Sequence, residues 1–252
     1  MEFWFSEFHT PDVKHSIRVN KQLYSKQSDY QRIDIFETPE FGRVLTLDGN
    51  VMLTERDEFI YDEMIVHVPM AVHKEAKDIL VIGAGDGGVV RELTRYDRVE
   101  RIDLVEMDPQ VVEACRAYLP GNACRMDDRR VHIYFENALK FIRRCEEEYD
   151  LIIVDSSDPF GPSEGLFTRE FYGSCFNALK RTASWSTSRA APSTPRTPAP
   201  CSAATSALHP PSPSAGCIRR ISPPLRQGTG CSALQAKNTI PSMIWTLNRG
   251  RR

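Results

Sequence analysis

Hydrophobic and polar positions follow their clearest pattern shortly before the middle of the chain. Residues 79–82 form an uninterrupted apolar run, ILVI, and the glycine-rich stretch GAGDGG follows at 83–88. The run is typical of a buried parallel strand, and glycine permits the sharp turn that brings backbone close to a ligand. Residues 89–96 then have helical spacing, and residues 102–105 predict a second strand that ends at Glu106. This order predicts half of a nucleoside-binding sheet, with Glu106 placed for ribose hydroxyls.

A third apolar run, residues 151–154, predicts another central strand, with Asp155 and Asp158 just beyond its carboxyl end. Because the carboxyl ends of parallel strands meet at one edge of a sheet, both are expected in the same crevice as Asp86 and Glu106. Four carboxylates around one pocket repel each other unless a cation binds there, so the set predicts a site for a positively charged ligand. Taken singly, Asp158, which precedes a proline, also suits the role of a helix cap.

The N-terminal stretch, residues 1–65, has the alternation and β-branched content of strands. Three segments carry this pattern, residues 16–23, 31–37 and 43–47, and the turn sequences PEFG and DGN follow the second and the third. Such runs, punctuated by glycine, proline and asparagine, predict a small antiparallel β domain ahead of the parallel sheet.

Residues 55–68 change to helical spacing, and Pro69 is expected to follow the end of this helix. Tyr61 and Asp62 lie between its apolar positions, and spacing alone predicts that both are on the surface. The apolar positions themselves are expected to be core: Phe59, Ile60, Met64 and Val68.

Composition changes near residue 180. Residues 1–180 contain 34 acidic and 22 basic side chains, a net charge of −12, whereas residues 181–252 contain ten basic side chains and no acid. Ten of the seventeen prolines also lie in that second part. The seven cysteines show no CxxC spacing, which fits reduced thiols better than a disulfide framework or a zinc site. Without a long apolar run or signal peptide, the chain is expected to be cytoplasmic, with no membrane or nucleic-acid partner.

Four motifs together resemble the spermidine synthases, the putrescine aminopropyltransferases. They are TERDEFIYDEM at 54–64, GAGDGG at 83–88, VEMD at 105–108 and VDSSDPFGP at 154–162, and the resemblance covers residues 1–180. It implies a Rossmann-like, methyltransferase-type α/β domain at 66–180 behind the small β domain, and a homodimer or homotetramer. The implied reaction moves an aminopropyl group from decarboxylated S-adenosylmethionine to putrescine, giving spermidine and methylthioadenosine.

The resemblance also implies roles for individual residues. Asp155 would accept a proton from the attacking amine, aided by Tyr61, because only a neutral amine has a lone pair for displacement. No cofactor and no metal ion is implied, since the decarboxylated donor is a co-substrate. The implied donor and nucleoside contacts are Gln31, Gly83, Gly85, Asp86, Glu106, Asn137, Ala138 and Pro162. The implied polyamine contacts are Asp62, Asp86, Asp155, Ser156 and Asp158.

Two positions depart from the family's usual pattern. Asp62 stands where these enzymes usually carry His, and adds an acid near the acceptor. Asn137 stands where they usually carry Asp, opposite the adenine amino group, and its side-chain carbonyl is expected to accept a hydrogen bond from that group.

Two other functions remain open on the sequence. An S-adenosylmethionine-dependent methyltransferase would share the fold and the glycine turn, but its substrate carries a carboxylate that Asp86 and Asp155 would repel. An inactive nucleoside-binding relic would be compatible with the altered composition of the C-terminal part.

The Ser, Pro, Ala and Arg bias of residues 181–252 is typical of a disordered basic tail, but a sharper interpretation exists. In a shifted reading frame, the third base of each codon joins the first two bases of the next. Residues 180–188 can then be read as KDGIMVNQ. Residues 191–205 can be read as PFYAEDAGALQR, then one unreadable position, then H. Residues 217–241 can be read as YQAHIPT and, after one position, PSGHWLFGFASKKYHP. Spermidine synthases carry IPTYPSG there. We therefore hypothesise a single frameshift near Lys180, which would leave this polypeptide poorly stable and nearly inactive.

Overall fold

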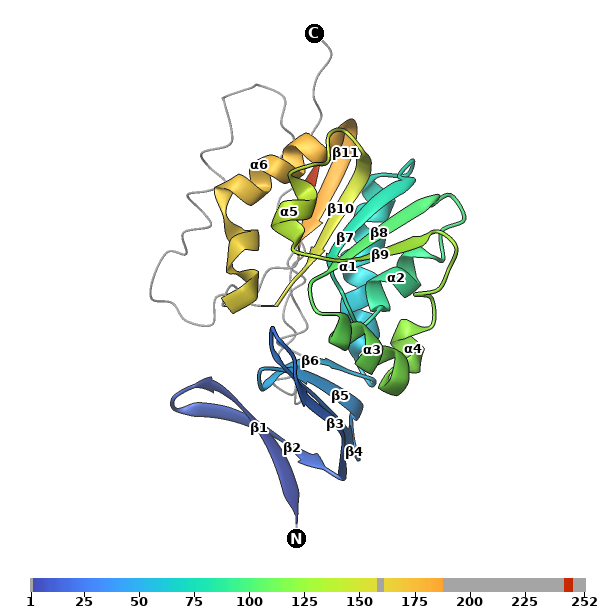
Figure 1. The fold of residues 1–252 in the computed structure, drawn as a ribbon. Helices are drawn as coiled ribbons and strands as arrows, with labels where there is room; N and C mark the ends of the chain where they lie inside the picture. Colours follow the sequence, from blue (N-terminus) through green and yellow to red (C-terminus); the bar gives the residue numbers. More distant parts are fainter. Residues whose placement is uncertain (1, 158–160, 188–242, 247–252) are drawn as a thin grey trace, which may run out of the picture.

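The computed structural model describes residues 2–157, 161–187 and 243–246, arranged as N-terminal antiparallel strands followed by an α/β unit (Figure 1). The N-terminal strands form a two-stranded sheet, β1-β2, and a four-stranded sheet, β3-β4-β5-β6. Their bounds are β1 (Phe3–Thr10), β2 (Val13–Val19), β3 (Lys21–Gln27), β4 (Arg32–Thr38), β5 (Gly42–Leu47) and β6 (Asn50–Thr54).

The predicted antiparallel character of this region is confirmed, with differences in detail. The strand expected at 16–23 is divided at Asn20 between β2 and β3, and β1 and β6 are strands that the sequence pattern does not reveal. The two predicted turns are present, because Gly42, Asp48 and Gly49 have positive φ angles of 67°, 49° and 78°.

Helix α1 (Glu58–Val72) continues past the proline at which the sequence predicts its end, since Pro69 lies inside the helix. The expected core positions are also wrong in part, because Phe59, Ile60 and Met64 are exposed. The buried residues lie on nearly the opposite side of the helix, at Asp62, Ile65, Val66, Pro69 and Met70. This face packs on the α/β unit, and the predicted domain boundary at residue 65 falls within α1.

The α/β unit is built on one sheet whose described strands lie in the order β9-β8-β7-β10-β11-β12. All neighbouring strands pair in parallel except β12, which is antiparallel to β11. The predicted Rossmann-like fold is thereby confirmed. The strand bounds are β7 (Asp78–Gly83), β8 (Arg101–Glu106), β9 (Val131–Phe135), β10 (Tyr149–Asp155), β11 (Leu179–Thr187) and β12 (Met243–Thr246).

Helices cover both faces of this sheet, as the continuous apolar runs of its central strands require. Ile79 and Val81 face a core with α1, α2 and α3, whereas Leu80 and Ile82 face a second core with α5 and α6 (Figure 1). The remaining bounds are α2 (Gly88–Leu93), α3 (Pro109–Tyr118), α4 (Pro120–Ala123), α5 (Ala138–Ile142), a 3-10 helix (Gly161–Phe167) and α6 (Arg169–Ala178).

A third apolar cluster joins the two parts of the chain. Ile33, Ile35 and Leu45 from the four-stranded sheet pack against Val111 and Cys115 of α3. The N-terminal sheet therefore rests on the helix that follows β8, close to the carboxyl edge of the parallel strands.

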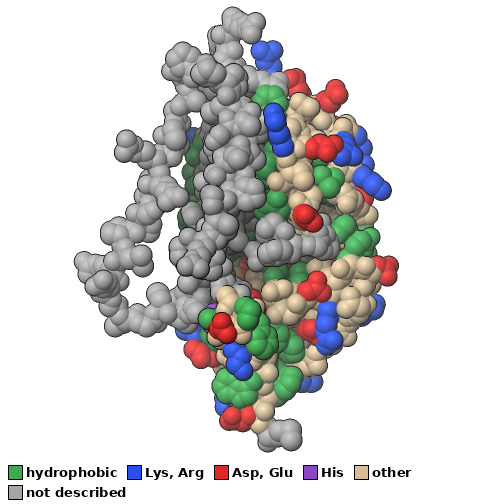
Figure 2. All heavy atoms as spheres, turned by 90° about the vertical axis from the view of Figure 1, so that its left-hand side faces the viewer, with side chains coloured by type: hydrophobic (Ala, Val, Ile, Leu, Met, Phe, Trp, Pro, Cys, Tyr) green, Lys and Arg blue, Asp and Glu red, His purple; other side chains and the backbone are tan. Residues whose placement is uncertain are grey.

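The β1-β2 hairpin carries large hydrophobic side chains that are exposed in the single chain, namely Phe3, Trp4, Phe8 and Val13. In Figure 2 such side chains gather at the lower end of the molecule, over the N-terminal strands. None of the helices in the described part of the chain is both long and apolar enough to cross a bilayer.

The C-terminal part differs from the expected unstructured tail where it is described. Residues 181–187 extend β11, and Met243–Thr246 pair with it as β12. Residues 188–242 and 247–252 lie outside the described residues, so the prediction of disorder stays a prediction for them.

Candidate active site

The end of β7 and the end of β10 lie side by side, and this brings the glycine turn against Asp155. In the parallel register, Asp155 is opposite Gly83. Gly83 has a φ of 82°, and a Cβ there would overlap the carbonyl oxygen of Asp155. Only glycine satisfies both conditions, which explains why the turn can pass so close to the neighbouring strand.

Asp155 and Tyr61 are in direct contact, although they come from a strand end and a helix. The Tyr61 hydroxyl donates a hydrogen bond to Asp155 Oδ1. Burial raises the pKa of Asp155 to about 7, the nearby charge of Asp86 adds to the rise, and the hydrogen bond from Tyr61 opposes it. A carboxylate with this pKa binds and releases protons near neutral pH, as a general base must.

Asp86 occupies the glycine turn itself. Its Oδ1 accepts a hydrogen bond of 2.7 Å from the backbone N–H of Gly88, the first residue of α2. Burial raises the pKa of Asp86, the Gly88 N–H opposes this, and the charge of Glu58 raises it further. The turn therefore holds a carboxylate whose charged form a nearby cation would stabilise.

Glu106 ends β8 on the other side of the turn. Its Oε1 accepts a hydrogen bond of 2.9 Å from the backbone N–H of Asp108. Burial raises the pKa of Glu106 to about 7 against the lowering effect of this bond. A Cβ at Gly85 would come within 2.8 Å of Glu106 Oε2, so glycine leaves room for the carboxylate beside the turn.

Asp62 is buried, contrary to its predicted surface position. It is 4% exposed, and a Cβ at Gly88 would overlap its carboxylate. Burial raises the pKa of Asp62 well above its ordinary value, and the charges of Asp86, Glu58 and Asp155 raise it further. Asp62 is therefore part of the acidic cluster. Tyr61, also predicted at the surface, is half-buried.

Arg91 balances part of this negative charge, and sequence reasoning does not identify it. Its guanidinium forms two hydrogen bonds with Glu58, of 2.8 and 3.1 Å, and lies 3.5 Å from Asp62 Oδ2. A further bond of 3.0 Å joins it to Glu92. The available signal is that Glu58 and Asp62 are four residues apart and share one face of a helix.

Asn137 is placed differently from its expected role. Its Oδ1 accepts hydrogen bonds from the backbone N–H groups of Leu139, at 2.9 Å, and Lys140, at 3.3 Å, as the N-cap of α5. Both lone pairs of that oxygen are engaged, so an adenine amino group would have to compete with the cap for it.

Some of the other predicted site residues are described by the structure and some are not. Gln31 is half-buried, and its side-chain amide donates to Asp108 Oδ2 at 3.3 Å. Ser156 is half-buried beside Asp155, and Ala138 begins α5. The backbone of Pro162 belongs to the 3-10 helix. Asp158 and the side chain of Pro162 lie outside the described residues. Within the described part, no three His, Cys, Asp or Glu side chains are arranged to hold a metal ion.

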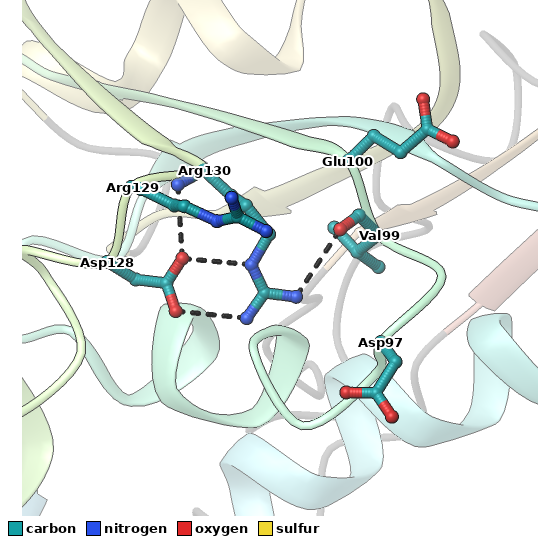
Figure 3. Close-up of a pocket in the computed structure, with 6 residues that line it drawn as sticks. All are labelled: Asp97, Val99, Glu100, Asp128, Arg129 and Arg130. Carbon is teal, nitrogen blue, oxygen red and sulfur yellow. Dashed lines mark hydrogen bonds and ion pairs between the residues drawn. The ribbon is translucent and has the colours of Figure 1, made fainter.

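A separate hollow of about 760 Å³ lies at the opposite edge of the sheet, where β8 and β9 begin (Figure 3). Arg130 lines this hollow, and its guanidinium donates hydrogen bonds to the carboxylate of Asp128, at 2.9 and 3.0 Å. It also donates to the carbonyl oxygens of Thr94 and Val99. This arrangement ties the end of α2 to the start of β9. The hollow is therefore a structural junction, remote from the carboxylate cluster.

Similar chains of known structure share this fold. A spermidine synthase in complex with the transition-state analogue AdoDATO superposes with a TM-score of 0.74 at 45% identity, covering 76% of this chain and 66% of that one. The spermidine synthase from Thermotoga maritima gives 0.73 at 45% identity, with coverage of 76% and 65%.

Curated relatives match the same part of the chain. The polyamine aminopropyltransferases of Alkaliphilus oremlandii and Clostridium botulinum are each 63% identical, over 180 and 179 residues. The match covers 71% of this chain and 63% of each relative, so the chain spans less than two thirds of their length. Residues 3–55 match the spermidine synthase tetramerisation domain, and residues 58–193 match the spermine/spermidine synthase domain. The chain belongs to the spermine/spermidine synthase family.

Proposed function

We propose that this chain transfers an aminopropyl group from decarboxylated S-adenosylmethionine to putrescine, producing spermidine and methylthioadenosine. The observation that carries the proposal is the Tyr61–Asp155 pair inside a cluster of carboxylates with raised pKa values. Both substrates are cations, and a cluster of acids with raised pKa values gains most from binding cations. The names of the relatives, polyamine aminopropyltransferase and spermidine synthase, support the same reaction.

The donor would lie along the carboxyl edge of β7 and β8. Glu106 would accept hydrogen bonds from the ribose hydroxyls, with Gln31 beside the nucleoside. Asp86 would pair with the ammonium at the end of the aminopropyl group, where the glycine turn holds its carboxylate at the start of α2. These contacts would place the carbon next to sulfur in front of Asp155.

The chemical step would be a direct displacement. A neutral putrescine nitrogen attacks the aminopropyl carbon bonded to sulfur, a C–N bond forms, and the C–S bond breaks. The electron pair of that bond goes to sulfur, which loses its positive charge as methylthioadenosine leaves. Asp155, oriented by Tyr61, accepts the proton that the nitrogen gives up. Holding the amine and the carbon in line would supply a further large part of the rate.

The methyltransferase alternative is disfavoured by the same cluster. S-adenosylmethionine carries a carboxylate where the decarboxylated donor has none. Asp62, Asp86 and Asp155 all affect one another electrostatically, so an additional negative charge among them would be repelled. The inactive nucleoside-binding relic stays an alternative because of the altered composition of residues 181–252, which contain ten prolines and no acidic side chain.

An assay with two donors tests the proposal. The purified 252-residue chain is incubated with labelled putrescine and either decarboxylated or intact S-adenosylmethionine, and the polyamines are separated by chromatography. Labelled spermidine is expected with the decarboxylated donor alone. Methylthioadenosine binding is measured in parallel by calorimetry. Binding without any spermidine would favour the relic, and methylated product from the intact donor would favour the methyltransferase.

The proposal extends to assembly and location. The match of residues 3–55 to a tetramerisation domain and the exposed aromatic side chains of the β1-β2 hairpin support a homodimer or homotetramer. The proposed substrates of this chain are small molecules, and the cysteines in the described part are free thiols. Both fit a cytoplasmic enzyme without nucleic-acid or membrane partners.

A further inference from the structure

Asp108 lies between two residues that the proposed donor site uses, one from each part of the chain. It follows β8 two residues after Glu106, and its side chain is almost completely buried. On one side it faces the N-terminal turn that contains Ser28 and Gln31, and on the other it begins α3. It therefore stands at the junction between the N-terminal strands and the α/β unit.

Each polar part of Asp108 has a separate partner. Oδ2 accepts a hydrogen bond of 2.6 Å from the Ser28 hydroxyl and one of 3.3 Å from the Gln31 side-chain amide. Oδ1 accepts the backbone N–H of Gln110 at 3.0 Å, which caps α3. The backbone N–H of Asp108 donates to Glu106 Oε1 at 2.9 Å. One residue is thereby bonded to both Gln31 and Glu106.

The turn on the N-terminal side is organised around the same contact. The Ser28 oxygen accepts the backbone N–H groups of Tyr30, at 3.1 Å, and Gln31, at 3.0 Å. Its own proton has two acceptors within reach, Asp108 Oδ2 at 2.6 Å and the Gln31 carbonyl oxygen at 3.0 Å, and the shorter separation is the one expected for a bond to a charged acceptor. The turn, the side chain of Gln31 and the start of α3 are held by one buried carboxylate.

We propose that Asp108 is a positioning residue for the nucleoside of the donor. It orients the amide of Gln31 and the carboxylate of Glu106 toward one ligand, and so makes the N-terminal β strands part of the donor site. The inference rests on the proposed function for the identity of the ligand, but not for the geometry of the Ser28–Gln31 turn.

An asparagine at this position separates the two roles of the side chain. The carbonyl oxygen of the new side chain could still cap α3, but its amide would then present N–H groups to Ser28 and Gln31, which are donors themselves. Turning the amide over would restore those two bonds and remove the cap. Asp108→Asn is therefore expected to displace the turn with little change in volume.

The test compares methylthioadenosine binding by calorimetry in the full chain and four variants. Asp108→Asn is expected to weaken binding by on the order of tenfold, the loss of a hydrogen bond to a charged group. The matched control is Asp103→Asn, an equally buried aspartate on β8 that accepts the Tyr149 hydroxyl at 2.7 Å on the opposite face of the sheet. This control is expected to bind normally even if its melting temperature falls.

Gln31→Ala tests whether Asp108 affects ligand binding through Gln31 or only through the stability of the fold. If Asp108 acts through Gln31, the double variant Gln31→Ala with Asp108→Asn should bind about as weakly as the weaker single variant. Losses that multiply would show independent effects and would overturn the proposal. Binding by Asp108→Asn within about twofold of the unaltered chain would overturn it as well.

Hydrogen exchange separates this inference from the proposed function. Peptides covering residues 28–31 are expected to exchange faster in Asp108→Asn than in the unaltered chain and in Asp103→Asn. If the unaltered chain fails to bind methylthioadenosine, the proposed ligand is wrong, and the exchange rates still decide the role of Asp108. Unchanged exchange at 28–31 would show that Asp108 does not hold the turn.

Discussion

The hydroxyl of Tyr61 donates a hydrogen bond to the carboxylate of Asp155, across 94 positions of sequence. The first residue belongs to a helix whose other face packs on the sheet, and the second ends a central strand. Because helix and strand are both held by core contacts, the two side chains meet without depending on a loop. The base of the proposed reaction is therefore oriented before any substrate binds.

Asp155→Asn is expected to abolish most spermidine formation, by a factor on the order of 10²–10⁴, because an amide cannot accept the proton. Methylthioadenosine binding should stay nearly unchanged. Turnover is measured with labelled putrescine, and binding by calorimetry on the same preparation. A variant with near-normal turnover would show that Asp155 is not the base.

Tyr61→Phe is expected to move the acidic limb of the pH–rate profile upward. The hydrogen bond from Tyr61 lowers the pKa of Asp155, so its loss raises that pKa above about 7, and a higher pH is needed to keep the base ionised. The profile of turnover against pH is compared between the two proteins. A limb at an unchanged pH would mean that the hydroxyl does not affect the base.

Asp86→Ala is expected to weaken the decarboxylated donor by roughly 10–100-fold, the effect of losing a charged hydrogen bond. Methylthioadenosine, which lacks the aminopropyl ammonium, should lose much less affinity. Calorimetry with both ligands gives the comparison. Equal losses would indicate that Asp86 shapes only the glycine turn, through its bond to Gly88.

The raised pKa values of Asp155 and Glu106 predict that stability falls as pH rises. Both groups have ordinary pKa values near 4 in an unfolded chain and about 7 in the folded one. Their contribution is fully present below about pH 4, is lost progressively up to about pH 7, and then stays constant. Melting temperatures should therefore decline between about pH 5 and pH 7, and Asp155→Asn should decline less.

Asp128→Asn is the control for this pH dependence. The pKa of Asp128 is lowered to about 2, chiefly by its hydrogen bond with Arg130, so its contribution disappears only in strong acid. This variant should lose stability equally at about pH 5 and pH 7. Identical pH dependence in Asp155→Asn and the unaltered chain would contradict the raised pKa of the base.

Resequencing the gene across codon 180 tests the frameshift hypothesis. The curated relatives match over 180 residues at 63% identity, as expected if the shared reading frame is lost near that position. A gene with the frame restored is expected to encode IPT and PSG in its last third and to form spermidine much faster. If the supplied frame is confirmed and the 252-residue chain works at ordinary enzyme rates, the hypothesis is wrong.

Features that depend on neighbouring positions in sequence could be predicted. The apolar runs that become β7, β8 and β10 show their burial directly, and the rule that ligands gather at the carboxyl edge then places Asp86, Glu106 and Asp155. The antiparallel turns are likewise marked by glycine and aspartate. Each of these signals is local.

Features that depend on packing could not be predicted in the same way. Asp62 is buried because it lies on the side of α1 that faces α2. The spacing of apolar residues along α1 does not determine which side of the helix is buried. The roles of Arg91 and Asp108 arise from partners 33 and 80 positions away, Glu58 and Ser28. No local pattern reports such pairings.

The apolar cluster between the N-terminal sheet and α3 has a consequence for unfolding. Ile33 and Ile35 are completely buried in a cluster that includes Val111 and Cys115 of α3, so both parts of the chain contribute side chains to one core. The four-stranded sheet cannot detach without exposing α3, and α3 cannot unwind without exposing the sheet. The two parts should melt in a single cooperative transition, and a fragment ending before α1 should fail to fold alone.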